Sequence, residues 1–124
     1  RHYPSTNTYG ILKYPTPIGS VESDEDILEF DGIRQAHPAW GLHQSIHHAL
    51  GSAAAVVIHN HDDVSVQFST SNRTVRPLIQ ESVYFYGDRM ITFEPELDSS
   101  EIPNRLYKDT IAVNLLNHGS LVWG

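Results

Sequence analysis

The chain has 124 residues, of which 40% are hydrophobic, so its length and composition suit one domain with its own core. The net charge of −7 and the scattering of only 8 lysines and arginines argue against a nucleic-acid or anionic-membrane partner. There is no cysteine, which excludes disulfides and thiolate ligands and fits a cytoplasmic location. No apolar run approaches the roughly 18 residues of a membrane span. These properties favour a small molecule as the partner.

The first third of the chain predicts a short strand, an acidic surface segment and a turn. Residues 9–14 have the composition of a strand, which two following prolines would end. Residues 22–26 are almost all acidic, and we interpret them as a solvated loop or the start of a helix. They lead into the apolar residues 27–30 and a turn at Asp31 and Gly32.

Residues 39–50 carry the most regular helical pattern in the chain. Their apolar positions recur at helical spacing, Pro38 precedes them and Gly51 follows them, which is typical of the two ends of a helix. His43 and His47 lie one turn apart within this segment. A glutamine follows His43, so the His-Glu-x-x-His zinc signature is absent. We interpret both histidines as core or helix-face residues.

The rest of the chain predicts alternating strands and helices. Strands are expected over residues 53–59, 83–86, 90–93 and 111–116, and helices over residues 62–70 and from 99 or 100 to 108. The first of these strands is continuously apolar, which is typical of a strand buried beneath helices. This order of elements predicts an α/β or α+β fold in a single domain spanning residues 1–124.

Three histidines form the most informative pattern. His59 and His61 stand two positions apart at the end of the apolar run 53–58, so a strand would direct both rings to one face. His118, near the C-terminal end, would complete a set of three ligands. Such a set leaves a coordination position open for water or substrate, as in catalytic sites. Imidazole ligands suit a divalent metal, with zinc favoured and manganese, iron or cobalt as alternatives.

Segments along nearly the whole chain resemble the class II aldolase/adducin family. They are NTYGIL (7–12), DILEFDG (26–32), WGLHQSIH (40–47), VVIHNH (56–61), the pair QE (80–81) with YFYGD (84–88), and AVNLLNHGSLVWG (112–124). The resemblance implies a three-layer α/β/α sandwich with a mostly antiparallel central sheet. It also implies metal ligation by His59, His61 and His118, and assembly into a homo-oligomer, a tetramer in the family.

The family's members are longer than this chain. Helices precede and follow the segment that resembles this sequence, and the sequence begins at Arg1 rather than at a methionine. We therefore expect either a chain truncated at one or both ends or a reduced version of the domain. Uncovered apolar faces on a shortened sheet would favour oligomerisation.

The sequence departs from the family where proton transfer is expected. The family's aldolases have a glutamate base at the position of Ala39, and a methyl group cannot accept a proton. The two serines that help hold a substrate phosphate are replaced by His37 and Pro38. Proton transfer would then fall to Glu81, His37, Tyr84, Tyr86 or solvent. We favour Glu81 and His37.

Two functions are consistent with these features. The first is a metal-dependent lyase-type enzyme that cleaves, decarboxylates or enolises a small hydroxy- or keto-substrate through a metal-stabilised enediolate. The second is an adducin-like oligomerising scaffold whose metal is structural or vestigial. The intact histidine set favours the enzyme, because gathering imidazoles at one point has a desolvation cost and no packing advantage.

Overall fold

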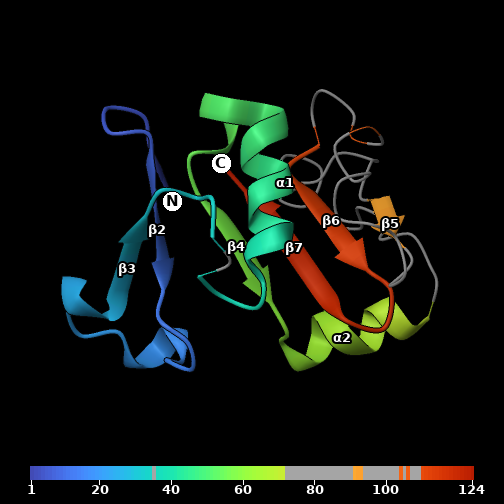
Figure 1. The fold of residues 1–124 in the computed structure, drawn as a ribbon. Coiled ribbons are helices and arrows are strands. Elements are labelled where there is room, and N and C mark those ends of the chain that lie inside the picture. Colours follow the sequence, from blue (N-terminus) through green and yellow to red (C-terminus); the bar gives the residue numbers. More distant parts are fainter. Residues whose placement is uncertain (35, 72–90, 94–103, 105, 107–109) are drawn as a thin grey trace.

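The computed structural model describes residues 1–34, 36–71, 91–93, 104, 106 and 110–124 (Figure 1). The described strands are β1 (His2–Tyr3), β2 (Thr8–Leu12), β3 (Ile27–Phe30), β4 (Val57–Asn60), β5 (Ile91–Phe93), β6 (Ala112–Leu115) and β7 (Gly119–Trp123). The α-helices in this part are α1 (Trp40–Leu50) and α2 (Asp63–Thr70), with 3-10 turns at Ile18–Ser20, Asp24–Asp26 and Gly51–Ala54. No helix among the described residues has the length and apolar character to cross a membrane.

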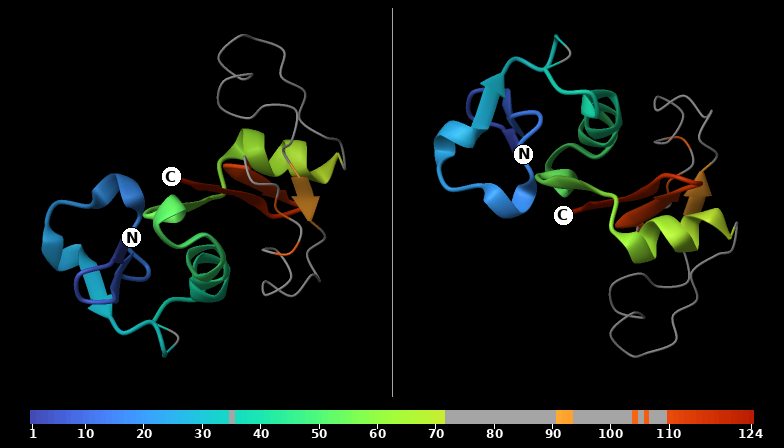
Figure 2. Two further views of the ribbon diagram at one scale, coloured as in Figure 1. Left: turned by 90° about the horizontal axis from the view of Figure 1, so that it is seen from above. Right: turned by 90° about the horizontal axis from the view of Figure 1, so that it is seen from below.

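The strands form two sheets. One has three strands in the order β1-β2-β3, and the other has four in the order β4-β7-β6-β5, with only the β5–β6 pair parallel. Helices α1 and α2 lie on opposite faces of the four-stranded sheet (Figure 2). This arrangement confirms the three-layer α/β/α fold with a mostly antiparallel sheet. The small sheet, on the far side of α1, had no counterpart in the predicted architecture.

Helix α1 packs on both sheets through different sides. Ile46 is fully buried against the four-stranded sheet, in a cluster that includes Val113 and Leu121. Trp40, at the start of α1, packs against rings of the small sheet, and its centroid lies 5.0 Å from that of Tyr9 and 4.8 Å from that of Phe30. Helix α1 therefore connects the small sheet to the four-stranded sheet, whose strand β4 carries one of the candidate ligands, His59.

The strand predicted over residues 53–59 differs from the observed structure. Its first half forms the 3-10 turn Gly51–Ala54, and β4 begins only at Val57. The expectation of a fully buried strand was wrong, because Val56 and Ile58 are 40% and 47% exposed. The reason is that β4 is an edge strand, and α2 packs on β6 and β7 instead of covering it.

The other predictions fall near the observed boundaries. The helices over 39–50 and 62–70 are confirmed, and Gly51 ends α1 with a φ of +53°. The strand over 9–14 ends at Leu12, and the one over 111–116 shortens to Ala112–Leu115. Ile91–Phe93 is a strand as predicted, and residue 90 lies outside the described residues. The segments 83–86 and 99–108 lie outside the described residues or almost entirely so. Strands β1 and β7 were not predicted.

His47 in α1 makes the stability of the fold depend on pH. It is 4% exposed, its Nδ1–H donates to the Ala54 carbonyl at 2.8 Å, and burial lowers its pKa to about 4. The unfolded chain therefore binds more protons below pH 6.5, so stability is complete above that pH and falls as pH decreases toward 4. Urea unfolding midpoints in EDTA should show that H47Q loses less stability on acidification than the wild type. An equal loss in both proteins would contradict this account.

Candidate metal centre

Two neighbouring strands of the four-stranded sheet bring the three histidines together. His59 lies on β4, and His118 lies in the turn between β6 and β7. Strand β7 pairs antiparallel with β4, and Leu121 lies opposite His59 in this pairing. The turn between β6 and β7 therefore lies beside the end of β4. His61 directly follows Asn60, the last residue of β4, so it stands just past the strand rather than within it.

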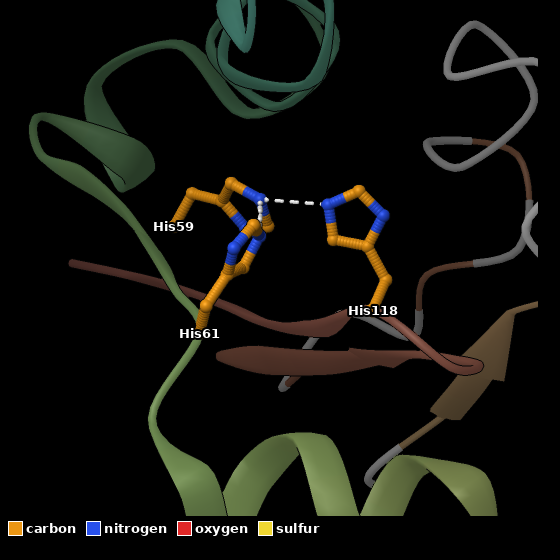
Figure 3. Close-up of side chains that lie close together, drawn as sticks. All are labelled: His59, His61 and His118. Atoms are coloured by element: carbon orange, nitrogen blue, oxygen red, sulfur yellow. Dashed lines mark hydrogen bonds between the residues drawn. The ribbon is translucent and has the colours of Figure 1, made fainter. Parts of the chain in front are cut away.

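The three rings point toward one another (Figure 3). The Nε2 atom of His59 lies 2.8 Å from Nε2 of His61 and 3.2 Å from Nε2 of His118. One ligand atom from each residue can be chosen such that all three atoms lie within 4.8 Å of one another. Among the described residues, this is the one group of three or more potential metal ligands. The structure thus gathers the predicted residues at one point.

The His59 ring is held in the form that can bind a metal through Nε2. Its Nδ1 lies 3.0 Å from the Ser120 carbonyl oxygen, which can only accept a hydrogen bond, so the ring proton resides on Nδ1. The Nε2 lone pair then faces the other two rings. Burial and the nearby charges of His61 and His118 lower the pKa of His59, although the bond to Ser120 opposes this change. A neutral ring is the metal-binding form.

The arrangement fits a single divalent ion. Two nitrogens that each lie about 2.1 Å from a zinc ion at the tetrahedral angle are roughly 3.4 Å apart. The separations of 2.8 and 3.2 Å from His59 to its neighbours are below that spacing by about 0.6 and 0.2 Å, so the rings would move slightly apart around an ion. The Ser120 carbonyl supplies the outer hydrogen bond that metal-binding histidines ordinarily make. Three imidazoles would leave room for a further oxygen ligand.

Hydrogen bonds fix the chain on both sides of His61. The Asn60 side chain accepts from the amide of Asp62 and donates to the Asp62 carboxylate. That carboxylate also accepts from the amides of Val64 and Ser65, and so caps the N-terminus of α2. The Ser65 hydroxyl also donates to this carboxylate, and it and the Ser65 and Val64 amides lower the pKa of Asp62 and keep it charged. His61 is therefore held between the end of β4 and a capped helix.

The His118 turn depends on two unusual backbone conformations. Asn117 has a φ of +57°, and Gly119 has a φ of +148°, a region in which side chains are strained. A Cβ atom at Gly119 would overlap the carbonyl oxygen of Asn60 and lie 3.0 Å from Cδ2 of His61. Glycine here allows the two ligand-bearing segments to approach each other closely.

The predicted proton-transfer residues have different outcomes. His37 lies in the segment before α1, and its charge contributes to lowering the pKa of His59, so the two rings are electrostatically close. Ala39 is the N-cap of α1 and makes no side-chain capping bond. Glu81 and Tyr84 lie outside the described residues, so their roles stay predictions.

Two residues near the site were not predicted to matter. Ser120 orients His59 through its backbone carbonyl, and only the pairing of β7 with β4 could have revealed this contact. His43 on α1 has its pKa lowered to about 4, mainly by burial and then by the charge of His59. The helical pattern predicted that His43 lies on this helix. It did not predict that His43 is close enough to His59 for their charges to interact. Neither residue belongs to the gathered set of three.

The fold and the gathered histidines together define a three-layer α/β/α domain with a candidate metal centre, and comparisons with known proteins give its family. A model of the class II aldolase and adducin N-terminal domain matches residues 4–124. The chain therefore belongs to the class II aldolase/adducin family. A search of curated proteins finds no significant match.

Two solved structures are similar to this chain. An aldolase II superfamily protein from Pseudomonas syringae has 22% sequence identity and a TM-score of 0.71, with 94% of this chain and 52% of that chain covered. The L-fuculose-1-phosphate aldolase from Thermus thermophilus has 20% identity and a TM-score of 0.71, with 93% and 62% covered. At these identities the likeness shows the fold. The chain spans between half and two thirds of the length of these proteins.

Proposed function

We propose that this chain is the metal-binding part of a lyase-type enzyme that acts on a small hydroxy- or keto-substrate. The convergence of three imidazole nitrogens within 4.8 Å carries the proposal. Membership of the class II aldolase/adducin family supports it. The proposed ligands are His59, His61 and His118, and the proposed ion is zinc, because three neutral imidazoles form a common catalytic zinc set.

When bound, a divalent ion would supply Lewis-acid stabilisation of negative charge that develops on a substrate oxygen. The chain's own residues would orient the ligands and move protons. His59 is kept in its Nδ1-protonated form by Ser120, so its Nε2 stays available without a change of tautomer.

Of the proton-transfer residues predicted from the sequence, we assign the role to His37, which the structure describes. Its Nδ1 accepts a hydrogen bond from the Ala39 amide at 3.0 Å, so a neutral His37 ring carries its proton on Nε2. Burial lowers the pKa of His37, which favours this neutral form near pH 7. The Nε2–H can therefore donate to a substrate oxygen, while the helix start keeps the ring in place.

A substitution at Ala39 tests whether the site lacks only its base. We expect zinc-loaded A39E to cleave erythrulose, a simple hydroxyketone, roughly 10²- to 10⁴-fold faster than the wild type, as a positioned proton acceptor would provide. The measurement is the release of formaldehyde, the product of retro-aldol cleavage. A39Q is the matched control, because it has nearly the same shape and cannot act as a base.

Equal rates for A39E and A39Q, with zinc bound to both, would contradict the lyase proposal. If the two variants and the wild type also keep one and the same oligomeric mass, the scaffold function becomes the better explanation. We propose self-association in either case, because the edge strand β4 exposes Ile58, and Val56 just before it is exposed as well. Light scattering of the purified protein measures that mass.

A further inference from the structure

A surface pocket of about 550 Å³ lies where the end of β2, strand β3 and the segment before α1 meet. This volume is within the range of small-molecule sites. Its described lining residues are Lys13, Tyr14, Leu28, Ala36, His37 and Pro38. None of its described lining residues is among the three gathered histidines, and His37 is the lining residue whose charge also contributes to lowering the pKa of His59.

The polar groups of this pocket are hydrogen-bond donors. Because the Ala39 amide occupies Nδ1 of His37, the Nε2–H of the neutral ring has no described partner and is free to donate. The Tyr14 ring packs edge-on against His37 at 5.6 Å between centroids, and its hydroxyl adds a second donor. Lys13 adds an ammonium group. No acidic side chain is among the described lining residues.

Among the described residues, Lys13 forms no ion pair. It contributes to lowering the pKa of Asp26, but the Asp26 carboxylate accepts from the amides of Glu22 and Ser23 at 3.0 and 3.2 Å. In a chain with a net charge of −7, a pocket that combines an ammonium group with neutral donors is a local site for an anion.

The remaining lining is apolar. Leu28 and Ala36 are partly buried against the aromatic cluster of the small sheet, and Pro38 adds a rigid apolar ring. Inorganic phosphate has no apolar part and therefore makes no favourable contact with these apolar side chains. A carboxylate that carries an apolar body can place its charge on Lys13 and His37 and its body over Leu28.

We propose that this pocket binds a small organic carboxylate with an apolar body. The further claim that this carboxylate belongs to the enzyme's substrate rests on the proposed function, in which His37 donates the proton. The binding site itself stands on the pocket alone, and can therefore be tested without metal.

The test is an NMR titration of the full chain in EDTA with benzoate, acetate, benzamide and inorganic phosphate. We expect benzoate to bind most tightly and to shift the amides of the described lining residues, whereas benzamide lacks the charge and acetate lacks the apolar body. K13M should weaken benzoate binding roughly tenfold, as the loss of one charged hydrogen bond does. H37N, which keeps an acceptor for the Ala39 amide, should weaken it as well.

The matched controls are R34M and H48N, which change an exposed cation and an exposed imidazole outside the described lining. They should leave benzoate binding unchanged. Benzamide or phosphate binding as tightly as benzoate, or K13M behaving like R34M, would overturn the inference. Because EDTA removes metal, these outcomes are independent of the proposed function. Failure of the metal centre would leave the carboxylate site intact, and failure of the pocket would leave metal binding unchanged.

Discussion

Alanine at His59 is expected to abolish stoichiometric zinc binding. His59 is the central ring of the set, because its Nε2 contacts the Nε2 atoms of both His61 and His118. Removing it leaves two ligands, so the loss of affinity should exceed the roughly 10- to 100-fold effect of residues that only hydrogen-bond to a ligand. Competition with a chromophoric chelator measures the affinity.

The control for this variant is H48A, which removes an exposed imidazole from α1. It should bind zinc like the wild type. Melting in EDTA separates ligation from folding: H59A should melt near the wild type without metal, and only the wild type should gain stability when zinc is added. An unchanged zinc affinity in H59A would show that the three rings do not share one ion.

Alanine at Gly119 is expected to damage both the fold and the site. Its backbone φ of +148° is strained for any side chain, and the new Cβ would overlap the carbonyl oxygen of Asn60. Together these effects should lower the free energy of unfolding by about 3 kcal/mol. Because the same Cβ presses on the His61 ring, zinc affinity should fall with stability. Urea unfolding and chelator competition measure the two effects.

Two other glycines separate the effect of backbone strain from the effect of the overlap with Asn60. Gly51 has a φ of +53° and a ψ of −124°, which strain other residues, but its Cβ position is in open space, so G51A should cost about 1 to 2 kcal/mol. Gly19 has open space and no positive φ, so G19A should change stability by less than about 0.5 kcal/mol. If G119A were no more harmful than G51A, the close approach of Asn60 to Gly119 would not constrain the site.

Local patterns predicted the elements whose signals lie within one stretch of chain. Helix α1 followed from its apolar spacing and Gly51, and α2 was expected over residues 62–70 with Asp62 or Asp63 as its cap, of which the structure uses Asp62. Both are stabilised by contacts between near neighbours in sequence, which composition and spacing can reveal.

Features that depend on distant pairing were beyond the sequence patterns. The exposure of Ile58 follows from the position of β4 at the sheet edge, and the hydrogen bond from His59 to Ser120 follows from the register of β7. A run of apolar residues has the same sequence pattern on an edge strand as on a central strand, so the pattern does not predict which of the two it forms. Strand β1, with two residues, is too short to have a periodicity.

The sequence predicted which residues form the candidate site but not how they are positioned. The spacing of His59 and His61 predicted two rings on one face of a strand, but His61 lies past the strand end and depends on Asn60 and Asp62 for its position. His118 was predicted as the third ligand, but no spacing within one stretch of chain could place it beside the other two, and the family resemblance supported the assignment. The donor pocket around His37 was not predicted, because Lys13 and His37 come from segments that meet only in the fold.

The X-ray absorption spectrum of the zinc-loaded protein tests the central claim most directly. We predict a coordination shell with three imidazole nitrogens at about 2.0 to 2.1 Å and the remaining position filled by oxygen. The spectrum of any zinc that H59A retains should show fewer imidazoles. A wild-type shell made only of oxygen atoms, or one with a single imidazole, would contradict the convergence of His59, His61 and His118 on one ion.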